Sequence, residues 1–122
     1  MRRFVIRSVD SGLKFDLRAD NGERILTSEV YATPAACRKG IASIRRNAPA
    51  APLAEPEDGP VPNPKFELYR DRADRFRFRL RAKNGKIIAV SEGYTSRAGC
   101  LNGVLSVKKC APDALIMKEE PL

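Results

Sequence analysis

The amino-acid sequence predicts an α+β protein made of two tandem β-β-β-α(-β) repeats. Three observations lead to this fold class: an internal duplication, alternating apolar and polar residues on both sides of the first turn, clearest in the second copy, and a helical pattern after a third apolar segment. One unit of about 50 residues would have a marginal core by itself. We therefore expect the two repeats to be related by pseudo-twofold symmetry and to share one antiparallel sheet packed against two helices.

The duplication has a constant offset of 63 residues. Asn21-Gly22 recurs as Asn84-Gly85, and Ala48-Pro49 recurs as Ala111-Pro112. The other identities pair Leu17, Ile25, Ser28, Glu29, Tyr31, Cys37, Gly40 and Ser43 with Leu80, Ile88, Ser91, Glu92, Tyr94, Cys100, Gly103 and Ser106. We assign repeat 1 to residues 1–50 and repeat 2 to residues 65–122, both within one compact domain. The proline-rich residues 51–64 are expected to be a semi-rigid linker outside the core.

Each copy is expected to contain three strands: the second has a plain period of two, and a third apolar segment follows the Asn-Gly turn. They cover residues 4–8, 13–19 and 24–29 in the first copy, and 65–70, 75–82 and 87–92 in the second. Asn-Gly should link the second and third strands, since both residues tolerate positive φ. A two-residue turn and a three-residue turn with a bulge differ by one residue in register. The sequence leaves open whether Ile87 or Ile88 faces the core.

A helix should follow the third strand in both copies. Thr33 and Ser96 are typical N-cap residues at its start. The predicted buried stripe consists of Cys37, Ile41 and Ile44 in the first helix and Cys100, Val104 and Val107 in the second. The Ala-Pro pairs end both helices, and residues 114–118 could form one more short strand.

Composition and charge limit the possible functions. The net charge of +8 and the pI near 9.8 favour anionic partners. No run of about 18 apolar residues is present, and the N-terminus lacks the apolar stretch of a secretory signal. Three cysteines are an odd number without disulfide-framework spacing. We expect a cytoplasmic protein that makes no membrane contact.

Two segments of the second copy carry a family resemblance: the strand ending L-R-A-K-N-G with the following S-E-G-Y, and the helix N-G-V-x-S-V-K-K followed by A-P-D-A. With them, the chain resembles the YegP-like family, small bacterial proteins with one or two copies of a domain of unknown function. The first copy is similar but more degenerate. The resemblance implies β3-α-β units that exchange their C-terminal strands, and it implies no biochemical activity. The first copy lacks an obvious apolar strand after its helix, which leaves its exchange open.

The sequence offers little catalytic chemistry. It has no histidine, no glycine-rich phosphate loop, no CxxC motif and no paired carboxylates in a catalytic setting. We therefore expect no enzyme, no cofactor and no metal site. Cys37 and Cys100 lie on apolar helical stripes and should be small buried core residues. Cys110 follows two lysines, so it is an alternative candidate for a reactive thiol.

A Ser-Glu-x-Tyr motif occurs at the strand-to-helix junction of both copies. Its residues are Ser28, Glu29 and Tyr31 in the first copy and Ser91, Glu92 and Tyr94 in the second. We expect a structural role, in which the glutamate satisfies backbone amides and the tyrosine anchors the loop through its ring and hydroxyl. The alternative is a catalytic pocket that buries the glutamate with the tyrosine.

An arginine row is the second candidate site: Arg75, Arg77, Arg79 and Arg81 alternate with apolar residues. Pairing with the preceding strand should place Glu67 opposite Arg77 or Arg79 and Tyr69 beside the row. We expect a solvated strand face, on a non-enzymatic module that binds an unknown protein partner or associates with itself. The alternative function is sequence-independent binding of nucleic acid or another polyanion by the four arginines and Tyr69.

Overall fold

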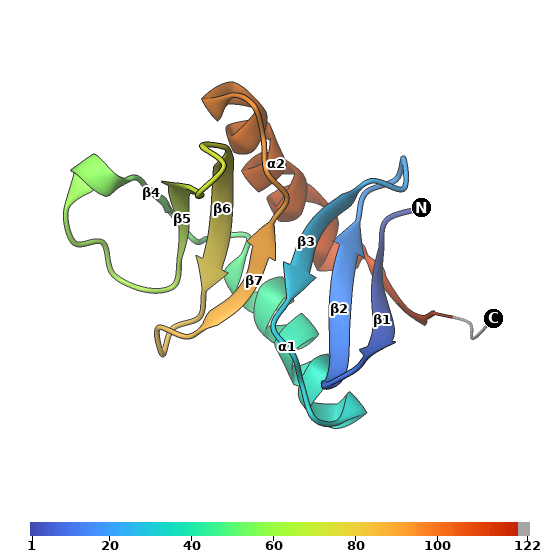
Figure 1. The fold of residues 1–122 in the computed structure, drawn as a ribbon. Helices are drawn as coiled ribbons and strands as arrows, with labels where there is room; N and C mark the ends of the chain where they lie inside the picture. Colours follow the sequence, from blue (N-terminus) through green and yellow to red (C-terminus); the bar gives the residue numbers. More distant parts are fainter. Residues whose placement is uncertain (120–122) are drawn as a thin grey trace.

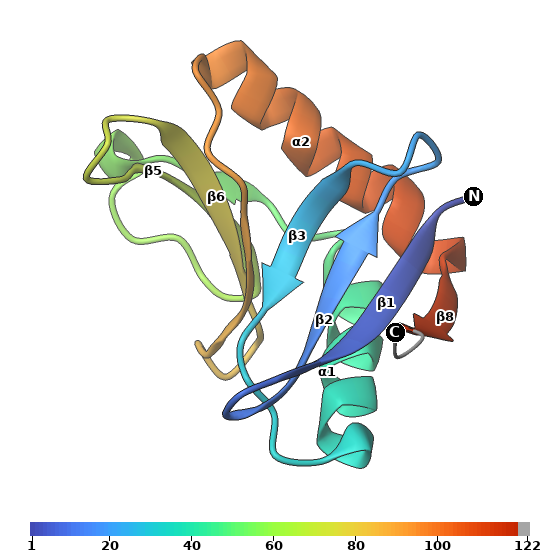
Figure 2. The same ribbon diagram turned by 45° about the vertical axis from the view of Figure 1, so that its right-hand side comes forward.

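The computed structural model describes residues 1–119 and contains one eight-stranded sheet with both helices on one face (Figures 1 and 2). The α+β expectation is confirmed. The elements are β1 (Arg3–Val9), β2 (Gly12–Arg18), β3 (Arg24–Ser28), α1 (Pro34–Asn47), β4 (Leu53–Ala54), the 3₁₀ turn η1 (Pro56–Asp58), β5 (Lys65–Arg70), β6 (Phe76–Arg81), β7 (Ile87–Ser91), α2 (Arg97–Cys110), the 3₁₀ turn η2 (Ala111–Asp113) and β8 (Leu115–Lys118).

The strand order is β4-β5-β6-β7-β3-β2-β1-β8. The six inner strands pair in antiparallel fashion, and β3 pairs with β7 where the two halves of the chain meet. The outermost pairs, β4–β5 and β1–β8, are parallel. The expectation of a purely antiparallel sheet is therefore wrong at both edges.

The edge strands are exchanged between the two halves. β4 follows α1 of the first half but pairs with β5 of the second, and β8 follows α2 of the second half but pairs with β1 of the first. The linker was expected to lie outside the core, and this is wrong for its first residues. Ala51 and Ala54 are buried, and the Phe66 amide donates to the Pro52 carbonyl over 2.8 Å.

Both Asn-Gly hairpins are three-residue turns with a bulge. The Gly22 amide donates to the Ala19 carbonyl, and the Ala19 amide donates to the Glu23 carbonyl, both over 2.9 Å. Glycine alone takes positive φ, at 86° in Gly22 and 85° in Gly85, so the asparagines do not need it. The bulge settles the third-strand register. Ile88 is 5% exposed in the core, and Ile87 is only partly buried.

The helices begin at the predicted caps and cover the sheet with the predicted stripes. Thr33 Oγ1 accepts from the Ala36 amide over 3.1 Å, and Ser96 Oγ accepts from the Gly99 amide over 3.0 Å. The stripe residues are buried in one core together with edge-to-face phenylalanine pairs, Phe4–Phe15 and Phe66–Phe78. Within residues 1–119, neither helix is long and apolar enough to cross a membrane.

Candidate functional site: the open face of the sheet

The face of the sheet opposite the helices, here called the open face, carries the polar residues of β1, β2, β3, β5 and β6, while β7 and β8 present apolar residues there, namely Ile87, Val90, Leu115 and Met117. Strand residues alternate between faces, and those facing the helices are the buried core residues. The strands give the open face the cations Arg3, Arg7, Lys14, Arg18, Arg24, Lys65, Arg77, Arg79 and Arg81 and the carboxylates Asp16 and Glu67. Arg75 directly precedes β6 and continues its alternation, and Asp71 and Glu92, which lie outside the strands, pair with Arg77 and Arg24. Cations therefore outnumber carboxylates across most of the face.

Glu67 is the acceptor for two members of the arginine row. It lies directly opposite Arg79, as the register argument allowed, and its Oε1 accepts from Arg79 Nε over 2.8 Å and from Arg81 Nε over 2.6 Å. Partial burial of the Glu67 carboxyl favours a higher pKa, but the hydrogen bonds from both arginines outweigh it and lower the pKa. Two of the four arginines thus have an internal counterion.

Arg77 is also paired, with a residue that the sequence did not indicate. Its Nε donates to Asp71 Oδ2 over 2.5 Å, and its Nη1 donates to the Ser91 carbonyl over 2.9 Å. Asp71 lies in the β5–β6 turn, where the bond from Arg77 and backbone bonds from Arg75 and Ala73 lower the pKa of its carboxyl. Arg75 precedes β6 and is exposed, and no carboxylate of residues 1–119 lies within 4.0 Å of its guanidinium.

Tyr69 lies beside the row, as expected, opposite Arg77. The guanidinium carbon of Arg79 lies 4.6 Å from the centre of its ring, a cation–π contact. The structure therefore brings together all the residues predicted for this site, namely Arg75, Arg77, Arg79, Arg81 and Tyr69, at one end of the open face.

The basic surface also extends over the first half of the sheet, which the sequence analysis did not identify. A hollow of about 400 Å³ lies there, lined by Arg3, Arg7, Arg18 and Arg24 with Val5 and Met117 among its walls. Asp16 is 2% exposed and accepts two bonds from Arg7, at 2.9 and 3.4 Å. The alternation Arg3-Phe4-Val5-Ile6-Arg7 was a usable signal, but its basic residues are fewer than those of RFRFRLR.

The serines of the Ser-Glu-x-Tyr motif are buried and bond to backbone groups. Ser28 Oγ accepts from the Phe15 amide and donates to the Glu29 carbonyl, each over 2.8 Å. Ser91 makes the equivalent bonds to the Phe78 amide and the Glu92 carbonyl, over 2.9 and 2.8 Å. These hydroxyls supply a hydrogen bond where the strand ladder is interrupted.

The tyrosines of the motif pack between the sheet and a helix. Tyr94 stacks on Phe78 with ring centres 6.4 Å apart, and its hydroxyl lies against Gly103 of α2. Tyr31 repeats this contact with Phe15 and Gly40. Burial raises the pKa of both hydroxyls. Contrary to expectation, neither hydroxyl bonds to backbone within residues 1–119, so the rings anchor these loops by packing.

The glutamates of the motif are not buried beside the tyrosines. Glu29 is exposed, and Glu92 pairs with Arg24 of the first half at the surface. The expected hydrogen bonds from backbone amides to these carboxylates do not form among the described residues, and neither glutamate forms the catalytic pocket considered as the alternative.

The cysteines are core residues. Cys37 and Cys100 are fully buried, and burial raises the pKa of both thiols, that of Cys100 to about 11. Cys110 is 3% exposed, so it does not present a thiol to solvent. Residues 1–119 contain no cluster of three or more histidine, cysteine or carboxylate side chains that would hold a metal ion.

Comparisons with known proteins agree with the fold. A family model, described as a domain of unknown function (DUF1508), matches residues 10–55 and again residues 71–117. A UPF0339 protein of Pseudomonas aeruginosa is 35% identical over 113 residues, 93% of this chain and 92% of its own length. A shorter UPF0339 protein of Treponema denticola is 57% identical over 54 residues, 44% of this chain and 93% of its own.

The solution NMR structure of YegP from Escherichia coli, described as a protein of unknown function, superimposes with a TM-score of 0.78. It is 31% identical, and the match covers 97% of this chain and 92% of YegP. The two matches to one domain model, the identity with relatives of nearly the same length and the shared fold together show that the chain belongs to the DUF1508 family of UPF0339 and YegP proteins, as its sequence motifs indicated.

Proposed function

We propose that this protein is a non-enzymatic binding module whose open face binds single-stranded nucleic acid without sequence preference. The observation that carries the proposal is the placement of both helices on one side, which leaves a basic sheet face uncovered (Figure 2). Flat sheets with cationic and aromatic side chains bind single strands through phosphate contacts and base stacking. We also infer a cytoplasmic protein, because its three cysteines are unpaired thiols.

The proposal includes the relation between the two halves, which we infer to be pseudo-twofold. When β1, β2, β3 and β4 are matched with β5, β6, β7 and β8, the strand order is the same from either edge of the sheet, and β3 pairs with β7 in the middle. Thr27 pairs with Val90, its own counterpart at the 63-residue offset, as expected for residues beside a twofold axis. Such an axis extends the open face over both repeats, so that the arginines of β6 and the cations of β1 and β2 belong to one surface.

The test compares two variants of equal net charge. Lys14→Gln, Arg75→Gln and Arg79→Gln together remove three cations from the open face. Arg38→Gln, Lys39→Gln and Arg46→Gln together remove three exposed cations from α1, on the other side of the molecule. Binding to a fluorescent oligonucleotide with 5′- and 3′-hydroxyl ends is followed by anisotropy between 50 and 200 mM salt.

We expect wild-type affinity to fall steeply with salt, because each phosphate contact adds about 0.7 to the slope of log affinity against log salt. The open-face variant should lose at least about tenfold in affinity and show a smaller slope, whereas the helix variant should bind like the wild type. Equal affinities of the two variants would show that net charge, and not the open face, governs binding.

A second candidate function is self-association through β8. This strand is an edge of the sheet, and its Leu115 and Met117 are 52% and 43% exposed. An exposed apolar edge strand can pair with the same strand of a second copy. Light scattering that gives a concentration-dependent mass for the wild type and a monomer mass for Leu115→Lys would support it, and a monomer mass for both would exclude it.

A further inference from the structure

Three arginines form one cross-strand row in the first half of the open face. Arg3 of β1 lies opposite Arg18 of β2, and Arg18 lies opposite Arg24 of β3. Like charges directly opposite one another destabilise a sheet. Arg24 is paired with Glu92, but no carboxylate within residues 1–119 lies within 4.0 Å of Arg3 or Arg18. Their guanidinium groups donate to the Met1 and Gly22 carbonyls, over 2.9 and 2.8 Å.

In the second half of the sheet, the corresponding cations Lys65 and Arg81 have a counterion, the Glu67 carboxylate. Lys65 lies opposite Arg81, and Glu67 lies within 2.6 Å of Arg81 Nε and 3.7 Å of Lys65 Nζ. The residue that corresponds to Glu67 is Val5, because Phe4 pairs with Leu17 as Phe66 pairs with Leu80. The first half therefore has an apolar side chain where the second half has a carboxylate.

The space over Val5 is the hollow of about 400 Å³ already described, and its charges are unbalanced toward the positive. Asp16 faces it, but Arg7 neutralises that carboxylate with two bonds, and Arg24 lies 3.9 Å away. At the β8 side, Lys118 and Glu119 oppose each other in charge. Arg3, Arg18 and Lys118 are the cations of the hollow without a carboxylate within 4.0 Å among the described residues, and of these Arg3 and Arg18 lie directly opposite each other on β1 and β2.

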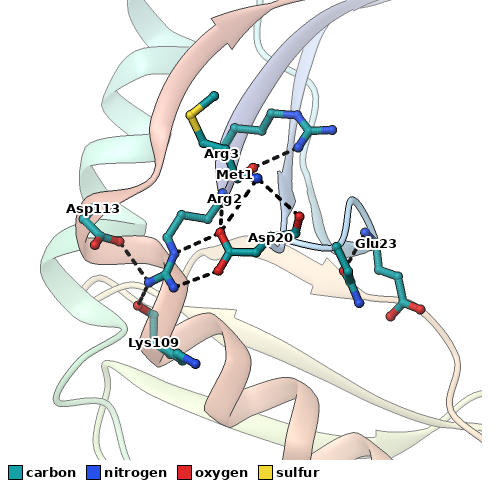
Figure 3. A network of polar contacts seen from close by, with 8 residues as sticks. Met1, Arg2, Arg3, Asp20, Glu23, Lys109 and Asp113 are labelled. Carbon is teal, nitrogen blue, oxygen red and sulfur yellow. Dashed lines mark hydrogen bonds and ion pairs between the residues drawn. The ribbon is translucent and has the colours of Figure 1, made fainter.

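The guanidinium of the neighbouring Arg2, in contrast, has hydrogen-bond acceptors in two carboxylates and a backbone carbonyl (Figure 3). It donates to Asp20 over 2.9 Å, to Asp113 over 3.2 Å and to the Lys109 carbonyl over 3.0 Å. In the same view, the Arg3 side chain extends away from this cluster of carboxylates. The carboxylates near the N-terminus, Asp20 and Asp113, thus pair with Arg2 and not with Arg3, which lines the hollow.

We propose that this hollow binds a compact phosphate-class anion. The anion lies above Val5, at the position that the Glu67 carboxylate occupies in the second half. Arginine pairs bind phosphate oxygens in a planar, bidentate geometry. The anion is inorganic phosphate or the terminal phosphate group of a larger molecule. The site needs only one phosphate group and is independent of the proposed binding of nucleic acid along the open face.

The experiment measures melting temperature in phosphate against chloride of equal ionic strength, at pH 7.5. Wild type should melt roughly 3–6 °C higher when phosphate exceeds its Kd about tenfold. Val5→Glu supplies an internal carboxylate, so it should melt above wild type in chloride and gain nothing from phosphate. Arg38→Gln, which removes an exposed charge from α1, should respond like wild type. An equal gain in wild type and Val5→Glu, or no gain in wild type, overturns the proposal.

NMR keeps the proposal testable where a variant fails to fold, and two oligonucleotides identify the source of the phosphate. Inorganic phosphate should shift the Nε–Hε signals of Arg3 and Arg18 in wild type, and shifts confined to other arginines overturn the site. If the source is a nucleic-acid end, a 5′-phosphorylated oligonucleotide should bind more tightly than its 5′-hydroxyl form, and Val5→Glu should abolish the difference. Equal binding of both forms, with the phosphate response intact, assigns the site to free phosphate or a small phosphate ester.

Discussion

At the scale of single residues, the arginines of the open face differ in whether a carboxylate of the protein forms an ion pair with them. Glu67 serves Arg79 and Arg81, Asp71 serves Arg77, and Asp16 serves Arg7. These pairs hold the guanidinium groups along the strands, and partly exposed pairs of this kind contribute little stability each. Arg3, Arg18 and Arg75 lack such a partner within residues 1–119, as does Lys14, so these four cations are available to an external anion.

Replacing Glu67 by glutamine tests the pairing with the arginines. Its pKa is lowered in the folded protein, so its contribution to stability is complete above the unfolded-state pKa of about 4.3. That contribution is lost as the pH falls below this value and through the lowered pKa. We expect Glu67→Gln to lose roughly 1 kcal/mol at pH 7 and to show a weaker decline of unfolding free energy in acid.

The measurement is urea denaturation at a series of pH values from 7 down to 3. Glu57→Gln is the matched control, because Glu57 is exposed and forms no ion pair with the described residues. Curves of the same shape for wild type and Glu67→Gln would mean that Glu67 gains nothing from Arg79 and Arg81.

At the scale of elements, the repeated Tyr–Gly contact joins each strand-to-helix loop to its helix. A Cβ added to Gly103 would lie 2.5 Å from Tyr94 Oη and 2.9 Å from Phe78 Cε2. Glycine to alanine in a helix ordinarily stabilises by about 1 kcal/mol. Here we expect Gly103→Ala to destabilise by about 1–3 kcal/mol through overpacking.

The double variant Gly103→Ala with Tyr94→Phe separates the two effects, because phenylalanine removes the clashing hydroxyl. It should recover part of the lost stability in thermal or urea denaturation. Asn102→Ala, at an exposed position of the same helix, should be neutral or slightly stabilising. A stabilising Gly103→Ala would show that the loop does not depend on this contact.

The sequence predicted most elements well, because their signals are local. Period-two alternation located β1, β2, β5 and β6, the Asn-Gly turns located β3 and β7 after them, and the hydroxyl caps at Thr33 and Ser96 located both helices. β4 has only two residues in a proline-rich segment, and its partner β5 lies across the junction of the two repeats. Its pairing is decided by long-range contacts that no local pattern records.

The candidate site was predictable only in part for the same reason. Alternation placed the β6 arginines on one face, and register placed Glu67 and Tyr69 beside them. Asp71 comes from a turn, whose backbone direction cannot be read from periodicity. The hollow over Val5 requires β1, β2, β3 and β8 to be neighbours, so alternation could place Arg3 and Arg7 on one strand face but could not show which other arginines lie beside them.

At the scale of the whole molecule, the two halves use the same framework for different surfaces. The core contacts recur at the 63-residue offset, in Phe15 and Phe78, Tyr31 and Tyr94, and Ser28 and Ser91. The open face does not recur in the same way, since Glu67 corresponds to Val5 and Arg79 corresponds to Asp16. The shared framework preserves the fold, and the differing outer residues are where we place function.

The most direct test of this account is an NMR titration of the arginine-labelled wild-type protein with an oligonucleotide that has hydroxyl ends. We predict shifts of the Nε–Hε signals of open-face arginines, with Arg75 and Arg79 among them, and unchanged signals for Arg38 and Arg46 on α1. Shifts confined to the helix side, or no shifts at a low salt concentration of about 50 mM, would contradict the claim that the open face binds nucleic acid.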